Sequence, residues 1–206
     1  MPRGTTKRRP VTVAALLDAA MELFAEQGFG ATSIPEICAL AGLTKGAFYS
    51  NFASKDELFL ALLDRSWSSR AAQLRAWMPP GEELAGVLEG RAAWPAAEPD
   101  RRWALVSMEF SLHAIRHPEV AARLVEHEGR VRAGLAALLA EALERAGRVP
   151  VVPVADLAWM VVAVSEGSDV QVLTNSSGGA AIRSDLGQQA ITALLRQFSR
   201  PISTED

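Results

Sequence analysis

The chain has 206 residues, of which 49% are hydrophobic and 22% are charged. That composition is ordinary for a globular protein and excludes an intrinsically disordered chain, while a single cysteine excludes a disulfide framework within the chain and a cysteine-based zinc cluster. The longest strongly apolar stretch, residues 157–164, is too short to span a bilayer, and no apolar segment follows the charged N-terminus as it does in a signal peptide. We therefore expect a cytoplasmic protein.

The charge is unevenly distributed along the chain. The net charge is −3 at pH 7, yet the first ten residues carry Arg3, Lys7, Arg8 and Arg9 and no acid. Because the rest of the chain is acidic, the protein is not expected to bind polyanions non-specifically over its whole surface. A basic N-terminal arm can still grip phosphates locally beside a surface that reads a nucleic acid. The sequence leaves open whether residues 1–10 contact DNA or form a solvated tail.

The N-terminal quarter shows helical periodicity. Apolar residues in the range 13–24 recur at the spacing of one helix face and predict a helix that Gly28 ends. Ser33 and Glu36 form a capping-box pattern with Pro35 in the first turn, which predicts a short second helix that ends at Gly42.

Two more short helical patterns come next. Thr44 is placed to cap a third helix, whose inward residues are Phe48 and Phe52. Ser54 and Glu57 form a second capping box, which predicts the start of a fourth helix that continues to about residue 63. Residues 11–65 are thus predicted to hold four helices with very short joints.

The rest of the chain is also predicted to be helical. No long stretch alternates with the two-residue period of a strand, and prolines interrupt the apolar residues 149–154. The expected helices cover about 67–78, 82–94, 100–116, 118–146, 154–175 and 180–198. We therefore expect an all-α chain of nine or ten helices.

The second and third helices, joined by Gly42-Leu43-Thr44, make a helix-turn-helix pattern. Because Phe48 and Phe52 are predicted to face inward, the start of the third helix is left on the outside. The small residues Gly46 and Ala47 lie there, and they would let the backbone approach a DNA groove closely.

Two segments carry a specific resemblance to a known family. Residues 32–58, which include the Gly-Leu-Thr turn and the Phe-Tyr-x-x-Phe-x-x-Lys run, resemble the signature of the tetracycline-repressor (TetR) family of bacterial regulators. Residues 17–29 resemble that family's first helix, so the resemblance covers about residues 11–63.

The resemblance implies an architecture and a function. Residues 1–10 would be a basic arm, 11–63 a three-helix DNA-binding head, and 64–206 a larger helical domain for ligand binding and dimerisation. The implied protein is a homodimeric transcriptional repressor that a small ligand, apolar or aromatic, releases from palindromic double-stranded operator DNA. It would not be an enzyme and would need no cofactor. The identity of the ligand, the operator sequence and the choice between repressor and activator are left open.

The resemblance also implies which residues touch DNA. Positions that contact bases and nearby phosphates in the family are occupied here by Thr44, Lys45, Gly46 and Ala47, and those that contact the DNA backbone by Thr32, Ser33, Tyr49, Asn51 and Lys55. This chain has Ala47 where the family often has threonine, Asn51 where it often has histidine, and Val13 where it often has a basic residue. Because alanine can meet only a thymine methyl, base readout is expected to depend on Lys45 and Thr44.

The candidate ligand-binding residues are large side chains on the later helices. They are Trp103, Met108, Phe110, His113 and Trp159, and the alternative is that they simply fill the core. Glu109, His113 and His117 recur at i, i+4 and i+8 on one helix face. That spacing could hold a metal, but only two of the three residues are histidines and Pro118 ends the helix there, so we expect polar lining or surface and no metal site.

The last two helices are predicted to form a dimer interface. Residues 154–172 are apolar on nearly all sides, and the final helix carries an apolar stripe made of Ala190, Ile191, Leu194, Leu195 and Phe198. Two such helices from each of two subunits would build a four-helix interface, and the alternative is that both are internal core. The sequence also allows two rival functions, a helical enzyme or small-molecule carrier that uses a C-terminal pocket and an adaptor that binds protein.

Overall fold

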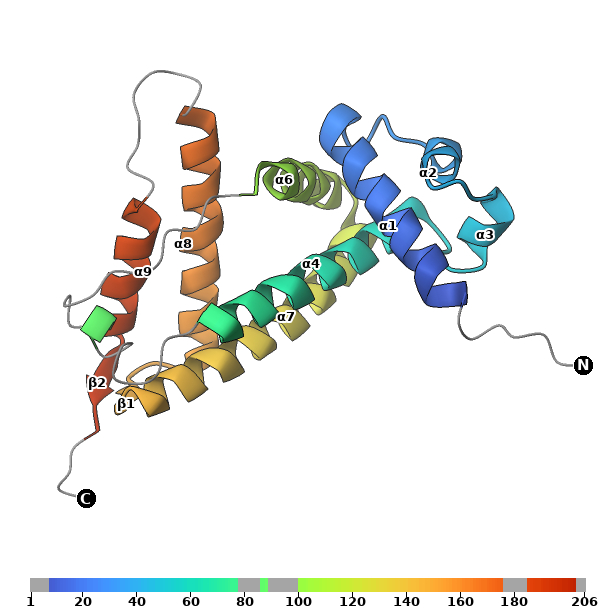
Figure 1. The fold of residues 1–206 in the computed structure, drawn as a ribbon. Helices are drawn as coiled ribbons and strands as arrows, with labels where there is room; N and C mark the ends of the chain where they lie inside the picture. Colours follow the sequence, from blue (N-terminus) through green and yellow to red (C-terminus); the bar gives the residue numbers. More distant parts are fainter. Residues whose placement is uncertain (1–7, 78–85, 89–99, 176–184, 203–206) are drawn as a thin grey trace, which may run out of the picture. The chain divides into compact units, whose positions relative to one another are not determined.

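A computed structural model describes residues 8–77, 86–88, 100–175 and 185–202 (Figure 1). These residues form α-helices and one short strand pair, which confirms the all-α class. None of the described helices is both long and apolar enough to cross a membrane. The helices are α1 (Arg8–Gln27), α2 (Ile34–Leu40), α3 (Lys45–Tyr49), α4 (Lys55–Trp77), α6 (Arg101–Arg116), α7 (Pro118–Arg145), α8 (Val154–Asn175) and α9 (Leu186–Gln197).

The predicted helix starts are confirmed by their caps. Ser33 Oγ accepts the Glu36 N–H at 3.4 Å, and the Glu36 carboxylate accepts the Ser33 N–H at 2.8 Å. Thr44 caps α3 by accepting the Ala47 N–H at 3.2 Å. These bonds satisfy N–H groups that the first turn of a helix leaves without partners.

Several predicted boundaries were wrong. α1 begins at Arg8, so the last residues of the predicted arm are helical. α4 is one helix to Trp77 where the sequence predicted two, because residues 64–66 contain no helix breaker. The helix predicted over 82–94 lies outside the described residues apart from 86–88, which are helical.

The structure also contains a strand pair that the sequence did not predict. β1 (Arg148–Pro150) pairs antiparallel with β2 (Ser199–Pro201), with Val149 opposite Arg200. The Arg148 guanidinium reinforces the pair by donating to Ser199 Oγ at 2.8 Å and to the Ser199 carbonyl at 2.6 Å. The sequence did not predict β1, because Pro150 lies within it and Pro153 follows it, and prolines argue against a strand. Each strand is also only three residues long, and the two are far apart in the sequence.

The chain divides into two compact units. The first holds residues 1–68 and 101–127, and the second holds residues 69–100 and 128–206. The first unit therefore contains α6 and the start of α7 as well as α1, α2 and α3. The domain limits drawn from the sequence, at residues 10 and 63, stay a prediction.

Aromatic side chains fill the core of the first unit. Phe29, in the turn after α1, lies 5.1 Å from Phe24, 5.8 Å from Phe59 and 5.2 Å from Phe110, measured between ring centroids. Phe59 and Phe110 stack at 3.6 Å, which joins α4 to α6. Burial of each such ring contributes about 1.5–3 kcal/mol, so this cluster is a main source of the unit's stability.

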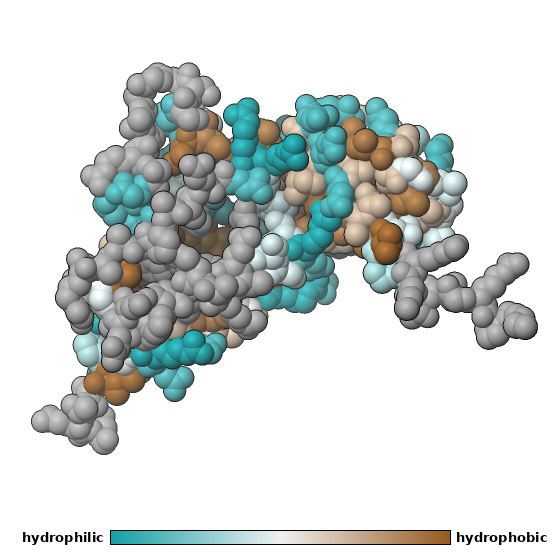
Figure 2. All heavy atoms as spheres, in the orientation of Figure 1, coloured by the Kyte–Doolittle hydropathy of each residue, from teal (hydrophilic) through white to brown (hydrophobic). Residues whose placement is uncertain are grey.

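In the second unit, α8 and α9 lie side by side (Figure 1). The sequence predicted that α8 is buried on more than one side, yet only Leu157 and Ala158 of this apolar helix are buried in the single chain. Trp159 is 54% exposed, and Figure 2 shows hydrophobic side chains at the surface over α8. An apolar helix with this much exposed surface is suited to contact another molecule.

Candidate nucleic-acid interface

The predicted helix-turn-helix is present as α2, a tight turn and α3. Gly42 has a φ of +65°, a conformation that glycine adopts without the steric cost that other residues meet. The Leu43 N–H donates to the Cys38 carbonyl at 2.8 Å and so closes the end of α2. Four residues, 41–44, therefore suffice to turn the chain from α2 into α3.

α3 has a buried side and an exposed side, as predicted. Phe48 is fully buried and Phe52 nearly so, with their ring centroids 5.8 Å apart. Thr44, Lys45, Gly46 and Tyr49 are exposed, and Ala47 is half-buried. The start of α3 thus offers small residues, one cation and one phenol to a partner.

Two predicted DNA-contact residues are engaged within the protein. The Asn51 Nδ2 amide donates to the Ala47 carbonyl at 2.8 Å, and Asn51 Oδ1 is buried. Thr32 is only 2% exposed, and its hydroxyl donates to the Gly28 carbonyl at 2.8 Å. Ser33 is exposed, although its hydroxyl also donates to Glu36 Oε2 at 2.6 Å.

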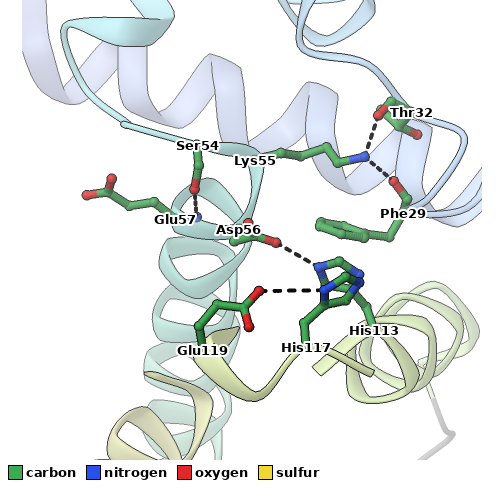
Figure 3. A network of polar contacts seen from close by, with 9 residues as sticks. All are labelled: Phe29, Thr32, Ser54, Lys55, Asp56, Glu57, His113, His117 and Glu119. Atoms are coloured by element: carbon green, nitrogen blue, oxygen red, sulfur yellow. Dashed lines mark hydrogen bonds and ion pairs between the residues drawn. The ribbon is translucent and has the colours of Figure 1, made fainter. Parts of the chain in front are cut away.

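Lys55 is a third predicted DNA-contact residue whose side chain is engaged inside the head (Figure 3). Its Nζ donates to the Phe29 carbonyl at 2.5 Å and to the Thr32 carbonyl at 2.7 Å. The ammonium also lies 4.4 Å from the centroid of the Phe29 ring, a cation–π distance. Burial lowers the pKa of Lys55, while the neighbouring carboxylates of Asp56 and Glu36 act in the opposite direction.

Residues of α6 contact the same region, a role that the sequence did not predict. Glu109 Oε2 accepts the Phe29 N–H at 2.5 Å, and His113 Nε2 lies 3.1 Å from Asp56 Oδ1 at the start of α4. Figure 3 shows the His113 and His117 rings close together, and their centroids are 4.3 Å apart. In the sequence, the even spacing of Glu109, His113 and His117 showed that they share one helix face. It could not show that their partners are Phe29, Asp56 and Glu119.

No metal site is found along this helix face or elsewhere in the described part of the chain. Among those residues, no group of three or more His, Cys, Asp or Glu side chains is arranged to hold a metal ion. His117 Nδ1 lies 3.5 Å from Oε1 of Glu119, a residue in the first turn of α7.

The five candidate ligand-binding residues come from both units, four from α6 in the first unit and Trp159 from the second. Phe110 and His113 pack against Phe29 in the first unit. Trp103 is buried, whereas Met108 is 44% exposed. Trp159 lies on α8, in the second unit. Their role in ligand binding stays a prediction.

Two family models match the chain. The model described as bacterial regulatory proteins of the tetR family matches residues 16–62. The model described as the C-terminal part of BetI-type transcriptional repressors matches residues 80–198, more than half of the chain. Together they cover the helix-turn-helix and most of the C-terminal part of the chain.

Individual relatives point the same way. The HTH-type transcriptional regulator AcrR of Shigella flexneri is 39% identical over 69 residues, which are 34% of this chain and 32% of AcrR. The matches to the first curated relatives thus span only about a third of those proteins. The HTH-type transcriptional repressor AcnR of Corynebacterium efficiens is 25% identical over 79% of this chain and 82% of its own. Among solved structures, the multidrug binding protein EbrR complexed with imidazole is 26% identical, with a TM-score of 0.58 over 94% of this chain and 96% of that chain.

Proposed function

Because this chain belongs to the TetR family of bacterial regulatory proteins, we propose that it is a DNA-binding transcriptional repressor. The observation that supports the proposal most directly is the exposed start of α3, which is anchored from behind by the fully buried Phe48. A short helix presented in this way fits the major groove of B-DNA. A repressor acts on the bacterial chromosome, so its place of action is the cytoplasm.

Each exposed residue of α3 has a proposed role. Lys45 and Thr44 read base edges or nearby phosphates, and Gly46 lets the backbone approach the groove. The Ala47 methyl group contacts a thymine methyl. The phenol O–H of Tyr49 donates a hydrogen bond to a phosphate oxygen.

The other four candidate residues flank α3. Ser33 is exposed at the start of α2 and contacts a phosphate there. The side chains of Thr32, Asn51 and Lys55 reach a phosphate only by giving up the internal hydrogen bonds described above.

The proposed repressor is a homodimer that pairs through α8 and α9. Support comes from the exposed apolar surface of α8 in the single chain and from its contact with α9. Two recognition helices related by a two-fold axis read a palindrome whose half-sites are about 34–36 Å apart.

The proposed signal is a small molecule, apolar or aromatic, that releases the repressor from DNA. EbrR, which is described as a multidrug binding protein and was solved with imidazole, supports a small-molecule effector. Trp103, Met108, Phe110, His113 and Trp159 stay the candidates for its binding site. The proposed role needs neither a cofactor nor catalysis.

The test is selection of a duplex by the purified protein from a pool of random-sequence DNA. We expect a palindromic duplex that binds with steep salt dependence, because neutralised phosphates release counterions. Lys45→Ala should weaken binding to the selected duplex while the circular dichroism spectrum stays unchanged. Failure to retain any duplex, at low salt as well, would overturn the proposal.

A further inference from the structure

Two oppositely charged side chains hold one backbone residue in the turn before the helix-turn-helix. The Phe29 N–H donates to the Glu109 carboxylate at 2.5 Å, and the Phe29 carbonyl accepts from Lys55 Nζ at 2.5 Å. Phe29 itself is 3% exposed. The two charged side chains thus hold both the N–H and the carbonyl of Phe29. Hydrogen bonds to charged groups are about twice as strong as those between neutral groups, so both bonds stabilise the turn strongly.

Lys55 also closes the helix-turn-helix on itself. Its second bond is to the Thr32 carbonyl, 23 residues earlier, just before the cap of α2. Lys55 is the first residue of α4, which comes after α3 in the chain. One ammonium therefore ties the start of α2 to the start of α4, the two ends of the segment that carries α3.

Glu109 reaches this turn from α6, 80 residues away in the sequence. Gly28 leaves the space for its carboxylate, because a Cβ at Gly28 would lie 2.6 Å from Glu109 Oε2. Glu109 thus holds the backbone of Phe29, and Gly28 makes room for it, although Glu109 lies outside the predicted DNA-binding head.

We infer that Lys55 and Glu109 are positioning residues for DNA binding, which clamp the Phe29 backbone and thereby fix how α3 is presented. Neither side chain contacts the DNA. This inference rests on the proposed function and replaces, for Lys55, the phosphate contact that the family resemblance implies.

The first test compares Lys55→Met with Lys45→Met on the selected duplex, at several salt concentrations. A lysine that contacts a phosphate contributes about 0.9 to the slope of log K against log salt. Lys55→Met is expected to weaken binding about tenfold with an unchanged slope, because the charged hydrogen bonds of the clamp are lost. Lys45→Met is expected to lower the slope by about 0.9 if Lys45 contacts a phosphate as proposed.

The second test uses Glu109→Ala, which also covers the case in which Lys55→Met does not fold. Removal of a negative charge ordinarily strengthens binding to DNA, yet loss of the clamp should weaken it about tenfold. Glu109→Gln keeps an acceptor for the Phe29 N–H and should restore part of the affinity. Glu22→Gln, which neutralises an exposed acid on α1, is the control and should bind at least as well as the wild type.

Three results would overturn the inference. They are a lower salt slope in Lys55→Met, an affinity of folded Lys55→Met equal to that of the wild type, and binding by Glu109→Ala that is unchanged or tighter. A wild-type protein that binds no duplex would instead remove the proposed function.

Discussion

Two features of the structure require glycine at position 28, the backbone conformation and the space beside it. The φ of +89° at Gly28 is left-handed, and a Cβ there would meet the Glu109 carboxylate. We expect Gly28→Ala to lower the free energy of unfolding by at least about 1–2 kcal/mol, the cost of the left-handed conformation. Displacement of Glu109 adds to that cost, so the loss should be smaller in a Glu109→Ala background.

Urea denaturation of the single and double variants measures this coupling. Gly30→Ala is the matched control in the same turn, because it has no heavy atom within 4 Å of an added Cβ. Equal losses from Gly28→Ala with and without Glu109 would contradict the steric part of the argument.

Glu36 is the residue whose titration should be visible in stability. Hydrogen bonds from Ser33 hold the pKa of Glu36 below its usual value of 4.5. The folded state therefore favours the carboxylate, and the stabilisation is complete above pH 4.5 and is lost as the pH falls through the lowered folded-state pKa. The stability difference between wild type and Glu36→Gln should thus disappear in acid, measured by thermal melts against pH. Glu22→Gln serves as the control, and a difference that grows in acid would contradict the prediction.

At the scale of elements, the packing of α8 against α9 depends on Gly187. A Cβ at this position would lie 2.7 Å from Ser168 Cβ and would also contact Ser168 Oγ. Although alanine favours helix by about 1 kcal/mol over glycine, the clash should outweigh this gain, with a net loss of about 1–3 kcal/mol for Gly187→Ala.

Gly134→Ala is the matched control, because a Cβ added at this glycine of α7 meets no neighbouring atom within 4 Å. It should be neutral or stabilising by up to about 1 kcal/mol. Chemical denaturation compares the two variants, and an equally stable Gly187→Ala would show that α8 and α9 adjust without cost.

The contrast between local and distant contacts decides what the sequence could predict. The caps at Ser33 and Thr44 join residues three apart, so their pattern is visible in the sequence, and so is the inward spacing of Phe48 and Phe52. The bonds of Lys55 to Thr32 and of Glu109 to Phe29 span 23 and 80 residues. Nothing in the periodicity of either partner identifies the other. The sequence also did not show that α4 is one continuous helix, because the lack of a helix-breaking residue is only a weak signal that a helix continues.

For the whole molecule, the main expectation is that function requires two chains. We expect Trp159→Glu to convert a dimer into monomers, because an unpaired charge buried in an apolar interface costs several kcal/mol. Analytical ultracentrifugation should show this change together with loss of affinity for the palindromic duplex. Val125→Glu alters an exposed residue of α7 and should stay dimeric. A wild-type monomer at micromolar concentration would contradict the expectation.

The pairing of β1 with β2 has a consequence for how the second unit opens. β1 precedes α8 and β2 comes after α9, so the strands fasten both ends of the segment that contains the two helices. With its ends joined, this segment has less entropy to gain by fraying than a free tail has. The amides of α8 and α9 should therefore exchange with deuterium in a single cooperative step, and Arg148→Ala should split that step so that α9 exchanges first.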